Sequence, residues 1–310
     1  MTSNLYKHQS ENVWKTWGLM TFFLVLVILL GWFAGFYFDN PLILFFAVFF
    51  SIGMNIFSYW YSDKIVLKMT GAKPVTRDQY FDLWNAVENL SITAGLPMPK
   101  VYVIDDSVPN AFATGRDKDH SAVAVTSGLL EILDKNELEG VIAHELAHIG
   151  NRDILLQTVV VVLVGFVTLL SDFFLRATIF GGNSDNKGGG QLQVALLIIG
   201  VILMILSPFV ATAIQLAISR KREFMADATG ALLTRYPEGL ASALEKISGF
   251  SGKKGKMKKA NHATAHMFFS SPFGEHGKKK RGFLNKLFST HPPTDERIAN
   301  LRGIKIKDNV

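Results

Sequence analysis

The sequence predicts a mainly α-helical membrane protein with four hydrophobic helices and a water-soluble α+β domain that holds a small sheet. The chain has 310 residues, of which 49% are hydrophobic and 19% are charged. Four stretches contain no charged residue, namely 17–38, 41–61, 154–171 and 191–219. The charges fall on the remaining segments, which therefore have an ordinary soluble composition. These segments also hold short alternating runs that are typical of strands.

Each uncharged stretch is long enough to be considered as a membrane helix. Spanning about 30 Å of hydrocarbon takes about 20 helical residues, and a helix satisfies its own backbone hydrogen bonds. Stretch 17–38 is too long for a cleaved signal and no small-x-small cleavage site follows it, so we expect a retained anchor. Stretch 154–171 is close to the lower length limit, and a buried core helix is its alternative interpretation.

The charges that flank these stretches predict their orientation, because Lys and Arg near helix ends stay in the cytoplasm. The loop after the first stretch has only Asp39, and the charges of loop 172–190 balance. Basic residues instead precede the first stretch and follow the second and fourth: Lys7, Lys15, Lys64, Lys68, Lys73, Arg77, Arg220, Lys221 and Arg222. We therefore expect both termini and segment 62–153 on the cytoplasmic side.

A basic loop at 253–281 contributes to the net charge of +6. Such a run near a membrane suits contact with anionic lipid headgroups, and a solvated flexible loop is the alternative. No nucleic-acid-binding module accompanies the charge, so we expect no nucleic-acid partner. The chain has no cysteine, which excludes a disulfide-stapled module, a thiol nucleophile and a cysteine metal site.

The soluble segments read as helices around a few strands. Thr76 and Gln79 form a capping-box pattern for a helix over 76–94, which Gly95 ends. Asp134 and Asn136 offer caps for a helix that begins near Glu137. The remaining expected elements are strands at 100–104, 110–115 and 122–126, helices at 221–233 and 237–247, and a loop at 249–282.

The helix expected to begin near Glu137 contains two histidines at a spacing that suits a metal ion. His144, Glu145 and His148 form an HEXXH motif, and residues at i and i+4 lie on one face of a helix. Both imidazoles can therefore bind one ion. A surface pair of histidines is the alternative, but the apolar neighbours Val141 and Leu146 predict a buried helix in which unpaired imidazoles are costly.

A catalytic zinc normally has three protein ligands, so a third ligand is expected. It must lie on the same side of the membrane as His144. Two predicted crossings separate His148 from helix 221–233, and Glu223 meets this condition. An exposed charge paired with a neighbouring arginine is its alternative role. Asp227, one turn further on the same helical face, could orient a ligand histidine.

Four segments resemble the signature segments of the HtpX family of heat-shock membrane zinc proteases, which are relatives of the CAAX prenyl endopeptidases. They are HELAHIGNRD at 144–153, SRKREFMAD at 219–227, NAFATG at 110–115 and STHPPTDERI at 289–298. The order of features matches over nearly all of the chain, although the hydrophilic head is longer than in the shortest family members. The resemblance implies a gluzincin-like catalytic domain on the cytoplasmic face of the bacterial inner membrane, acting in membrane-protein quality control.

The resemblance also implies roles for individual residues. His144, His148 and Glu223 would bind one Zn²⁺ per chain, with Glu145 as the general base. His291 would stabilise the oxyanion, although without the family it reads as a loop imidazole before two prolines. Arg297 would support that loop or the Glu223 carboxylate. A peptide would pair with a sheet edge formed by Asn110, Ala111 and the strand residues Val123, Ala124 and Val125, for which ordinary strand packing is the alternative.

This interpretation divides the chain into five parts. They are a cytoplasmic tail (1–16), a transmembrane hairpin (17–61), the first part of the catalytic domain (62–153), a second hydrophobic hairpin (154–219) and the second part of the catalytic domain (220–310). The expected function is zinc-dependent hydrolysis of misfolded or damaged membrane proteins. A catalytically silent scaffold is the alternative, but Glu145 is present, and a transporter would place ionisable residues inside the spans.

Overall fold

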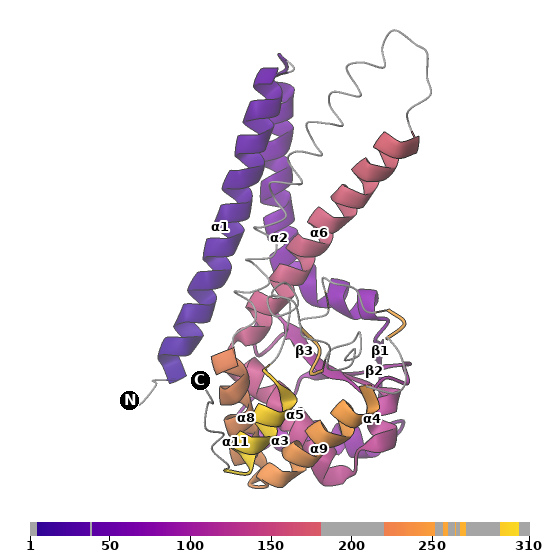
Figure 1. Ribbon diagram of the computed structural model, residues 1–310. Helices are drawn as coiled ribbons and strands as arrows, with labels where there is room; N and C mark the ends of the chain where they lie inside the picture. The colour runs from indigo at the N-terminus through magenta and orange to yellow at the C-terminus, as the bar shows by residue number, and fades with distance from the viewer. Residues whose placement is uncertain are drawn as a thin grey trace, which may run out of the picture.

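A computed structural model describes residues 5–37, 39–180, 220–251, 257–259, 264, 267–270 and 292–303. Two long helices, α1 (Leu5–Tyr37) and α2 (Leu42–Thr70), rise side by side from a body of helices and strands (Figure 1). A third long helix, α6 (Asp153–Phe180), leaves the same body and diverges from them. The body contains all the other described elements.

Helices α1 and α2 are the two described helices that are long and apolar enough to cross a membrane by length and composition. The first two predicted spans are therefore confirmed, although both helices are longer than their uncharged stretches. Helix α1 already begins at Leu5, and α2 continues past Tyr61 until Gly71 ends it in a left-handed conformation with φ of 73°. The expected cytoplasmic tail thus includes the first turns of α1.

The other two predicted spans have different outcomes. Stretch 154–171 lies within α6, which follows helix α5 (Lys135–Gly150) at a bend of 84° and counts as a third span only if this bent pair is taken as one. The first half of α6 is buried in protein, as the core-helix alternative requires: Leu155, Val159 and Leu163 pack against α1. Stretch 191–219 lies outside the described residues.

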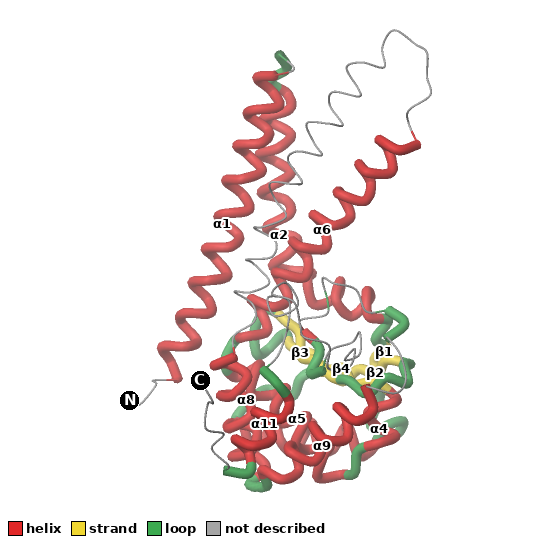
Figure 2. Tube along the Cα trace, viewed as in Figure 1, coloured by secondary structure: helices red, strands yellow, loops and turns green. Residues whose placement is uncertain are grey.

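The sheet has four strands in the order β1-β2-β4-β3 (Figure 2). They are β1 (Lys73–Pro74), β2 (Lys100–Ile104), β3 (Ala111–Gly115) and β4 (Ser121–Thr126). Strand β4 pairs in parallel with β2 and antiparallel with β3. Because β4 has a neighbour on each side, it is not an edge strand. The sequence placed Val123, Ala124 and Val125 at the edge, but the edge strands are β3 on that side of the sheet and β1 on the other.

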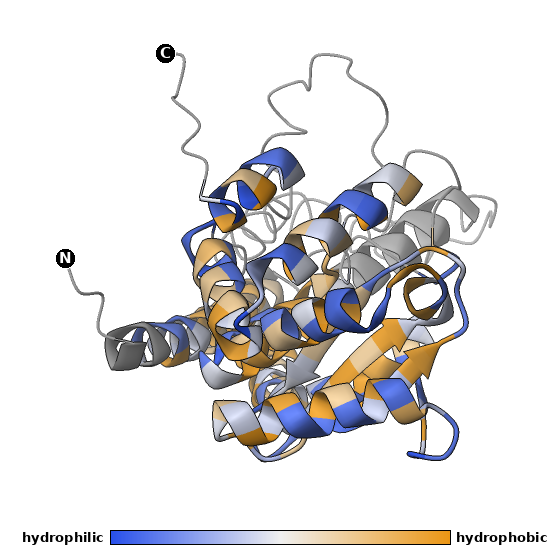
Figure 3. Cartoon of the chain, turned by 90° about the horizontal axis from the view of Figure 1, so that it is seen from below, coloured by the Kyte–Doolittle hydropathy of each residue, from blue (hydrophilic) through white to orange (hydrophobic). Residues whose placement is uncertain are grey.

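The helices of the body pack around α5. They are α3 (Phe81–Ala94), α4 (Ser127–Ile132), α8 (Arg220–Thr234), α9 (Pro237–Ser251) and α11 (Thr294–Leu301). The main core joins apolar residues of α3, the sheet, α5 and α9. Seen from below, the strands are largely hydrophobic, whereas the surrounding helices mix hydrophobic and hydrophilic residues (Figure 3). Helix α5 itself contacts α3, α8, α9 and the strands β3 and β4.

Two helix starts show how local signals act. Two caps were expected for α5. Asp134 is the cap, in a complete capping box with Glu137, whereas Asn136 lies inside the helix. Helix α3 begins at Phe81 and not at Thr76. The Thr76 N–H does donate to Gln79, at 3.1 Å, but this contact closes a turn before the helix.

Candidate metal centre

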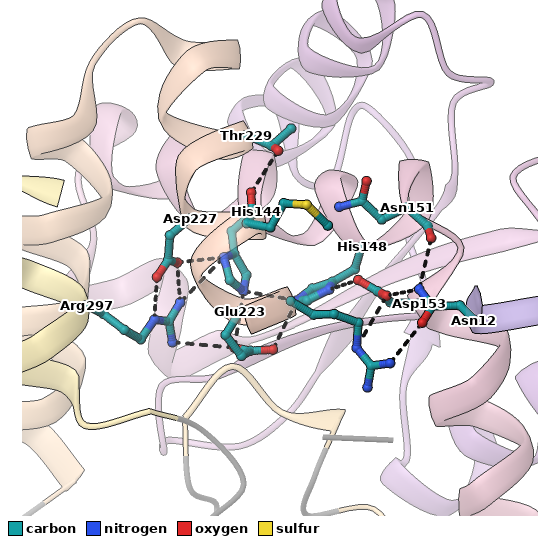
Figure 4. A network of polar contacts seen from close by, with 11 residues as sticks. Asn12, His144, His148, Asn151, Asp153, Glu223, Asp227, Thr229 and Arg297 are labelled. Carbon is teal, nitrogen blue, oxygen red and sulfur yellow. Dashed lines mark hydrogen bonds and ion pairs between the residues drawn. The ribbon is translucent and has the colours of Figure 1, made fainter. Parts of the chain in front are cut away.

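Two histidines of α5 and one glutamate of α8 converge in the interior of the body (Figure 4). The Nε2 atoms of His144 and His148 are 3.2 Å apart. The Glu223 carboxylate lies 3.8 Å from His144 Nε2 and 3.5 Å from His148 Nε2. All three side chains are buried. The pair of histidines and the glutamate that the sequence singled out are thus brought together across 75 positions of chain between His148 and Glu223.

These three side chains fit one divalent metal ion. Tetrahedral ligands at about 2.0–2.1 Å from an ion lie about 3.3 Å from one another. The two Nε2 atoms are 3.2 Å apart, and Glu223 approaches His148 with Oε1 at 3.5 Å and His144 with Oε2 at 3.8 Å. All three ligand atoms lie within 4.8 Å of one another. Two imidazole nitrogens and one carboxylate oxygen form a donor set that suits a borderline-soft ion and leaves one tetrahedral position for a reactant.

His144 is oriented by Asp227 of α8, which is itself held by Arg297 of α11. Its Nδ1 lies 2.9 Å from Asp227, which holds the proton on Nδ1 and leaves Nε2 as the ligand atom. The buried Arg297 of α11 donates two hydrogen bonds to the same carboxylate, at 2.9 and 2.6 Å, and lies 3.9 Å from Glu223. Asp227 thus contacts a histidine of the group, as the sequence predicts, whereas the hydrogen bonds of Arg297 go to Asp227 and its approach to Glu223 is longer.

His148 has a partner of its own that the sequence analysis missed. Its Nδ1 lies 2.9 Å from Asp153, the first residue of α6. Arg152 adopts a left-handed conformation with φ of 58°, so the chain turns sharply after α5 and brings Asp153 back to the histidine. The available signal was the aspartate that ends the segment HELAHIGNRD. Each ligand histidine therefore has one buried carboxylate partner.

The buried surroundings shift the pKa values of the two histidines in opposite directions. Burial, helped by Arg297, lowers the pKa of His144 to about 4 despite the hydrogen bond to Asp227. Burial also disfavours a charged His148, but Asp153, Glu223 and Glu145 outweigh it and raise the pKa of His148 to about 9. The carboxylates thus favour a protonated His148, in addition to the charged Arg297. A metal ion held by the same three side chains would replace that proton.

Glu145 lies next to this group. It is buried on α5 between the two histidines in sequence, and its charge raises the pKa of both His148 and Arg297. One residue along a helix rotates a side chain by about 100°, so Glu145 does not share the ligand face with His144. A buried carboxylate close to a metal group is chemically able to accept and return a proton.

The close contact between α5 and α8 sets the position of Glu223. Glu223, Asp227 and Gly230 follow at helical spacing on the face of α8 toward α5. A Cβ atom on Gly230 would lie only 3.1 Å from the His144 backbone nitrogen. The missing side chain therefore lets the two helices approach closely enough for their ligands to meet.

The predicted peptide-binding edge is covered by another part of the chain. The Phe269 N–H donates to the Ala111 carbonyl at 2.8 Å. The buried Asn110 side chain donates to the Ser270 carbonyl at 2.8 Å and accepts from the Ser270 N–H at 3.0 Å. The Phe269 ring also packs edge-on against His144 at 5.1 Å. A peptide can therefore pair with Ala111 only in place of Phe269.

The sequence predicts a loop over 249–282 and gives no contact between 267–270 and the metal group. Met267, Phe268 and Phe269 are buried, and these apolar residues were the available signal. Residue His291, predicted to stabilise an oxyanion, lies outside the described residues. So does most of the basic loop at 253–281.

Comparison with known proteins places the chain in a recognised group. The profile of Peptidase family M48 matches residues 79–305. The chain is 45% identical to "Protease HtpX homolog" of Caldanaerobacter subterraneus subsp. tengcongensis, over 97% of this chain and 98% of that protein. It is 46% identical to the protein of the same name from Desulfatibacillum aliphaticivorans, over 96% of this chain and 90% of that protein. The crystal structure of S. mikatae Ste24p aligns with 96% of this chain and 67% of that chain, at 18% identity and a TM-score of 0.48.

Proposed function

The chain belongs to Peptidase family M48, and from this premise we propose that it is a zinc endopeptidase that cleaves membrane proteins at the cytoplasmic face of the bacterial inner membrane. Membership makes it a membrane metalloprotease, and the His144, His148 and Glu223 group is positioned to bind the metal ion. The identity of the ion as zinc, the substrates and the side of the membrane belong to the proposal. The observation that supports it best is the buried metal group with Glu145 beside it.

The chemistry follows from the side chains around this group. A zinc ion bound there would act as a Lewis acid on the carbonyl of the scissile peptide bond. Glu145 would take the proton of the attacking water and pass it to the leaving amine. Asp227 and Asp153 would keep both histidines in the ligand tautomer. By family resemblance, His291 would donate to the developing oxyanion. These intact elements favour an enzyme over a silent scaffold.

The proposed cytoplasmic orientation follows from charges at one end of the α1–α2 hairpin. Lys15 precedes the apolar part of α1. Lys64 and Lys68 lie in the last two turns of α2, and Lys73 lies just beyond it. These basic residues are at the end of the hairpin that joins the body, whereas Asp39 is at the opposite turn. Because Lys and Arg near membrane helices stay in the cytoplasm, the body and its metal centre would face the cytoplasm.

Membrane proteins are the proposed substrates because the centre is close to the bilayer. Asn12 of α1 contacts Asp153, the partner of His148, at 2.6 Å. The apolar part of α1 starts at Trp17, about 7–8 Å further along the helix axis. Cleavage would thus take place within a short distance of the headgroups. The basic residues of 253–281 would add contact with anionic lipids there.

Hydrolysis of a fluorogenic peptide by the purified protein in detergent tests the enzymatic part of this proposal. Activity should disappear with a chelator and return with one equivalent of zinc. Glu145→Gln should keep the zinc but lose activity by about 10²–10⁴-fold, because the ligands remain and the base is lost. Glu139→Gln, on the same helix, is the matched control and should stay active. Activity that resists chelation, or a Glu145→Gln variant as active as the parent, would disprove the assignment.

Single cysteines test the orientation, since the chain has none of its own. Asn40→Cys lies in the turn between α1 and α2, and Asp119→Cys lies in an exposed loop of the body. A membrane-impermeant maleimide should label Asn40→Cys in intact spheroplasts and Asp119→Cys only after lysis. The reverse pattern would place the metal centre outside the cytoplasm.

A further inference from the structure

Asn12 is a buried polar residue of α1 that contacts three other parts of the chain. It is 2% exposed and lies before the apolar stretch of the helix. Its amide nitrogen donates to the Asp153 carboxylate at 2.6 Å and to the Asn151 carbonyl at 3.3 Å. Its amide oxygen accepts from the Arg222 guanidinium at 2.9 Å. The contacts thus connect α1 to the α5–α6 bend and to α8 (Figure 4).

These contacts fix the carboxylate that orients His148. Asp153 uses one oxygen for His148 Nδ1 at 2.9 Å and the other for Asn12. The Arg222 Nε atom also approaches that second oxygen, at 3.5 Å. A carboxylate held at both oxygens cannot rotate away from the histidine without breaking a buried hydrogen bond. The neutral amide of Asn12 can donate to Asp153 and accept from Arg222 at once, which neither a hydrocarbon nor a carboxylate can do.

Apolar packing keeps Asn12 in this position. Two and three turns further along α1, Met20 and Phe23 pack against Leu155, Val159 and Leu163 of α6. The same two helices therefore meet through a polar contact at the bend and an apolar contact beside it. This arrangement makes the placement of Asp153 depend on how α1 packs, because α6 and Asp153 belong to one helix.

We propose that Asn12 is a positioning residue for the metal centre, acting through Asp153 on His148, so that the first membrane helix completes the site. The inference rests on the proposed function, since it assumes that His148 binds zinc. The segment before the first apolar stretch is then a functional part of the enzyme and not a tail. Loosening α1 should release the metal although every ligand is unchanged.

Zinc affinity of the full-length protein in detergent, measured by competition with a chromogenic chelator, tests this inference. Asn12→Leu removes both hydrogen-bonding groups and should weaken zinc binding about 10-fold, the lower end of the effect of groups that orient metal ligands. Asn12→Ala, which adds no bulk, should do the same and covers the case in which leucine prevents folding. Thr16→Val is the matched control, since the hydroxyl of this buried neighbour donates to the Asn12 carbonyl within α1. It should bind zinc like the parent.

A double-mutant cycle separates positioning from general destabilisation. If Asn12 acts through Asp153, adding Asn12→Ala to Asp153→Asn should weaken zinc binding by less than twofold more. At saturating zinc, kcat of Asn12→Ala should recover to the parent value, because ligands and base are intact. Parent-like zinc affinity in both Asn12 variants, or losses that multiply in the double variant, would overturn the inference. A parent protein that binds no zinc would instead refute the proposed function.

Discussion

Replacing Gly230 with alanine should weaken metal binding while leaving the fold intact. Gly230 lies on α8, one and two turns after Asp227 and Glu223, where this helix meets α5. An added Cβ would lie 3.1 Å from the His144 nitrogen, and 3.3 Å from the His144 Cα and the Ala143 carbonyl carbon. All three atoms are backbone atoms of a buried helix, so they cannot rotate away.

The size of the effect follows from these distances. Ordinary van der Waals contact begins near 3.4 Å, so α8 must move by roughly 0.3 Å or more away from α5. Glu223 moves with the helix, whereas metal–ligand distances tolerate only about 0.2 Å. We expect zinc affinity to fall by about 10–100-fold. Stability should change less, because overpacking costs about 1–3 kcal/mol and alanine in place of glycine returns about 1 kcal/mol of helix propensity.

Chelator competition and thermal unfolding, each on the metal-free and zinc-loaded protein, measure the two effects separately. Gly249→Ala in α9 is the matched control, since a Cβ there meets no atom within 4 Å. It should leave zinc affinity unchanged. A Gly230→Ala protein that binds zinc as tightly as the parent would show that the distance between α5 and α8 does not set the ligand geometry.

Three further substitutions test other parts of the account. Asp227→Asn removes the charge that orients His144 and should weaken zinc binding about 10–100-fold in the same competition assay; unchanged affinity would refute that role. Leu163→Arg places an unpaired charge in the apolar contact between α6 and α1, where burying it is costly, and should weaken zinc retention and lose proteolysis that added zinc partly restores. Full zinc occupancy and activity would show that the soluble parts assemble the site alone. Arg152→Gly removes the strain of a non-glycine residue in the left-handed conformation and should stabilise the protein by about 1 kcal/mol, seen as a higher unfolding temperature. A lower unfolding temperature would show that Arg152 is not strained at this bend.

The sequence predicts best those features that depend on local patterns. Helical spacing put His144 and His148 on one face of a helix, and Glu223 does lie beside them. The predicted placement of Glu223 assumed two membrane crossings, of which the first begins in a protein-buried part of α6 and the second lies outside the described residues. The strand at 100–104 was predicted with its observed bounds, because alternation and flanking turns define a short strand. The family resemblance is confirmed by the relatives that match nearly the whole chain.

The features that it did not predict depend on contacts between distant segments. Strand order cannot be read from alternation, so β4 was taken for an edge although β3 lies outside it. Asp153 and Asn12 are ordinary polar residues until the bend after α5 and the packing of α1 bring them together. Phe269 reaches His144 from a stretch whose lysines and glycines favoured a loop.

Zinc K-edge X-ray absorption of the protein loaded with one equivalent of zinc tests the central claim most directly. The account predicts two imidazole nitrogens and oxygen ligands at about 2.0–2.2 Å, with no sulfur, from His144, His148 and Glu223. In Glu223→Ala the two imidazoles should remain. A spectrum with three imidazoles or a sulfur ligand, or a Glu223→Ala protein that binds zinc as tightly as the parent, would contradict it.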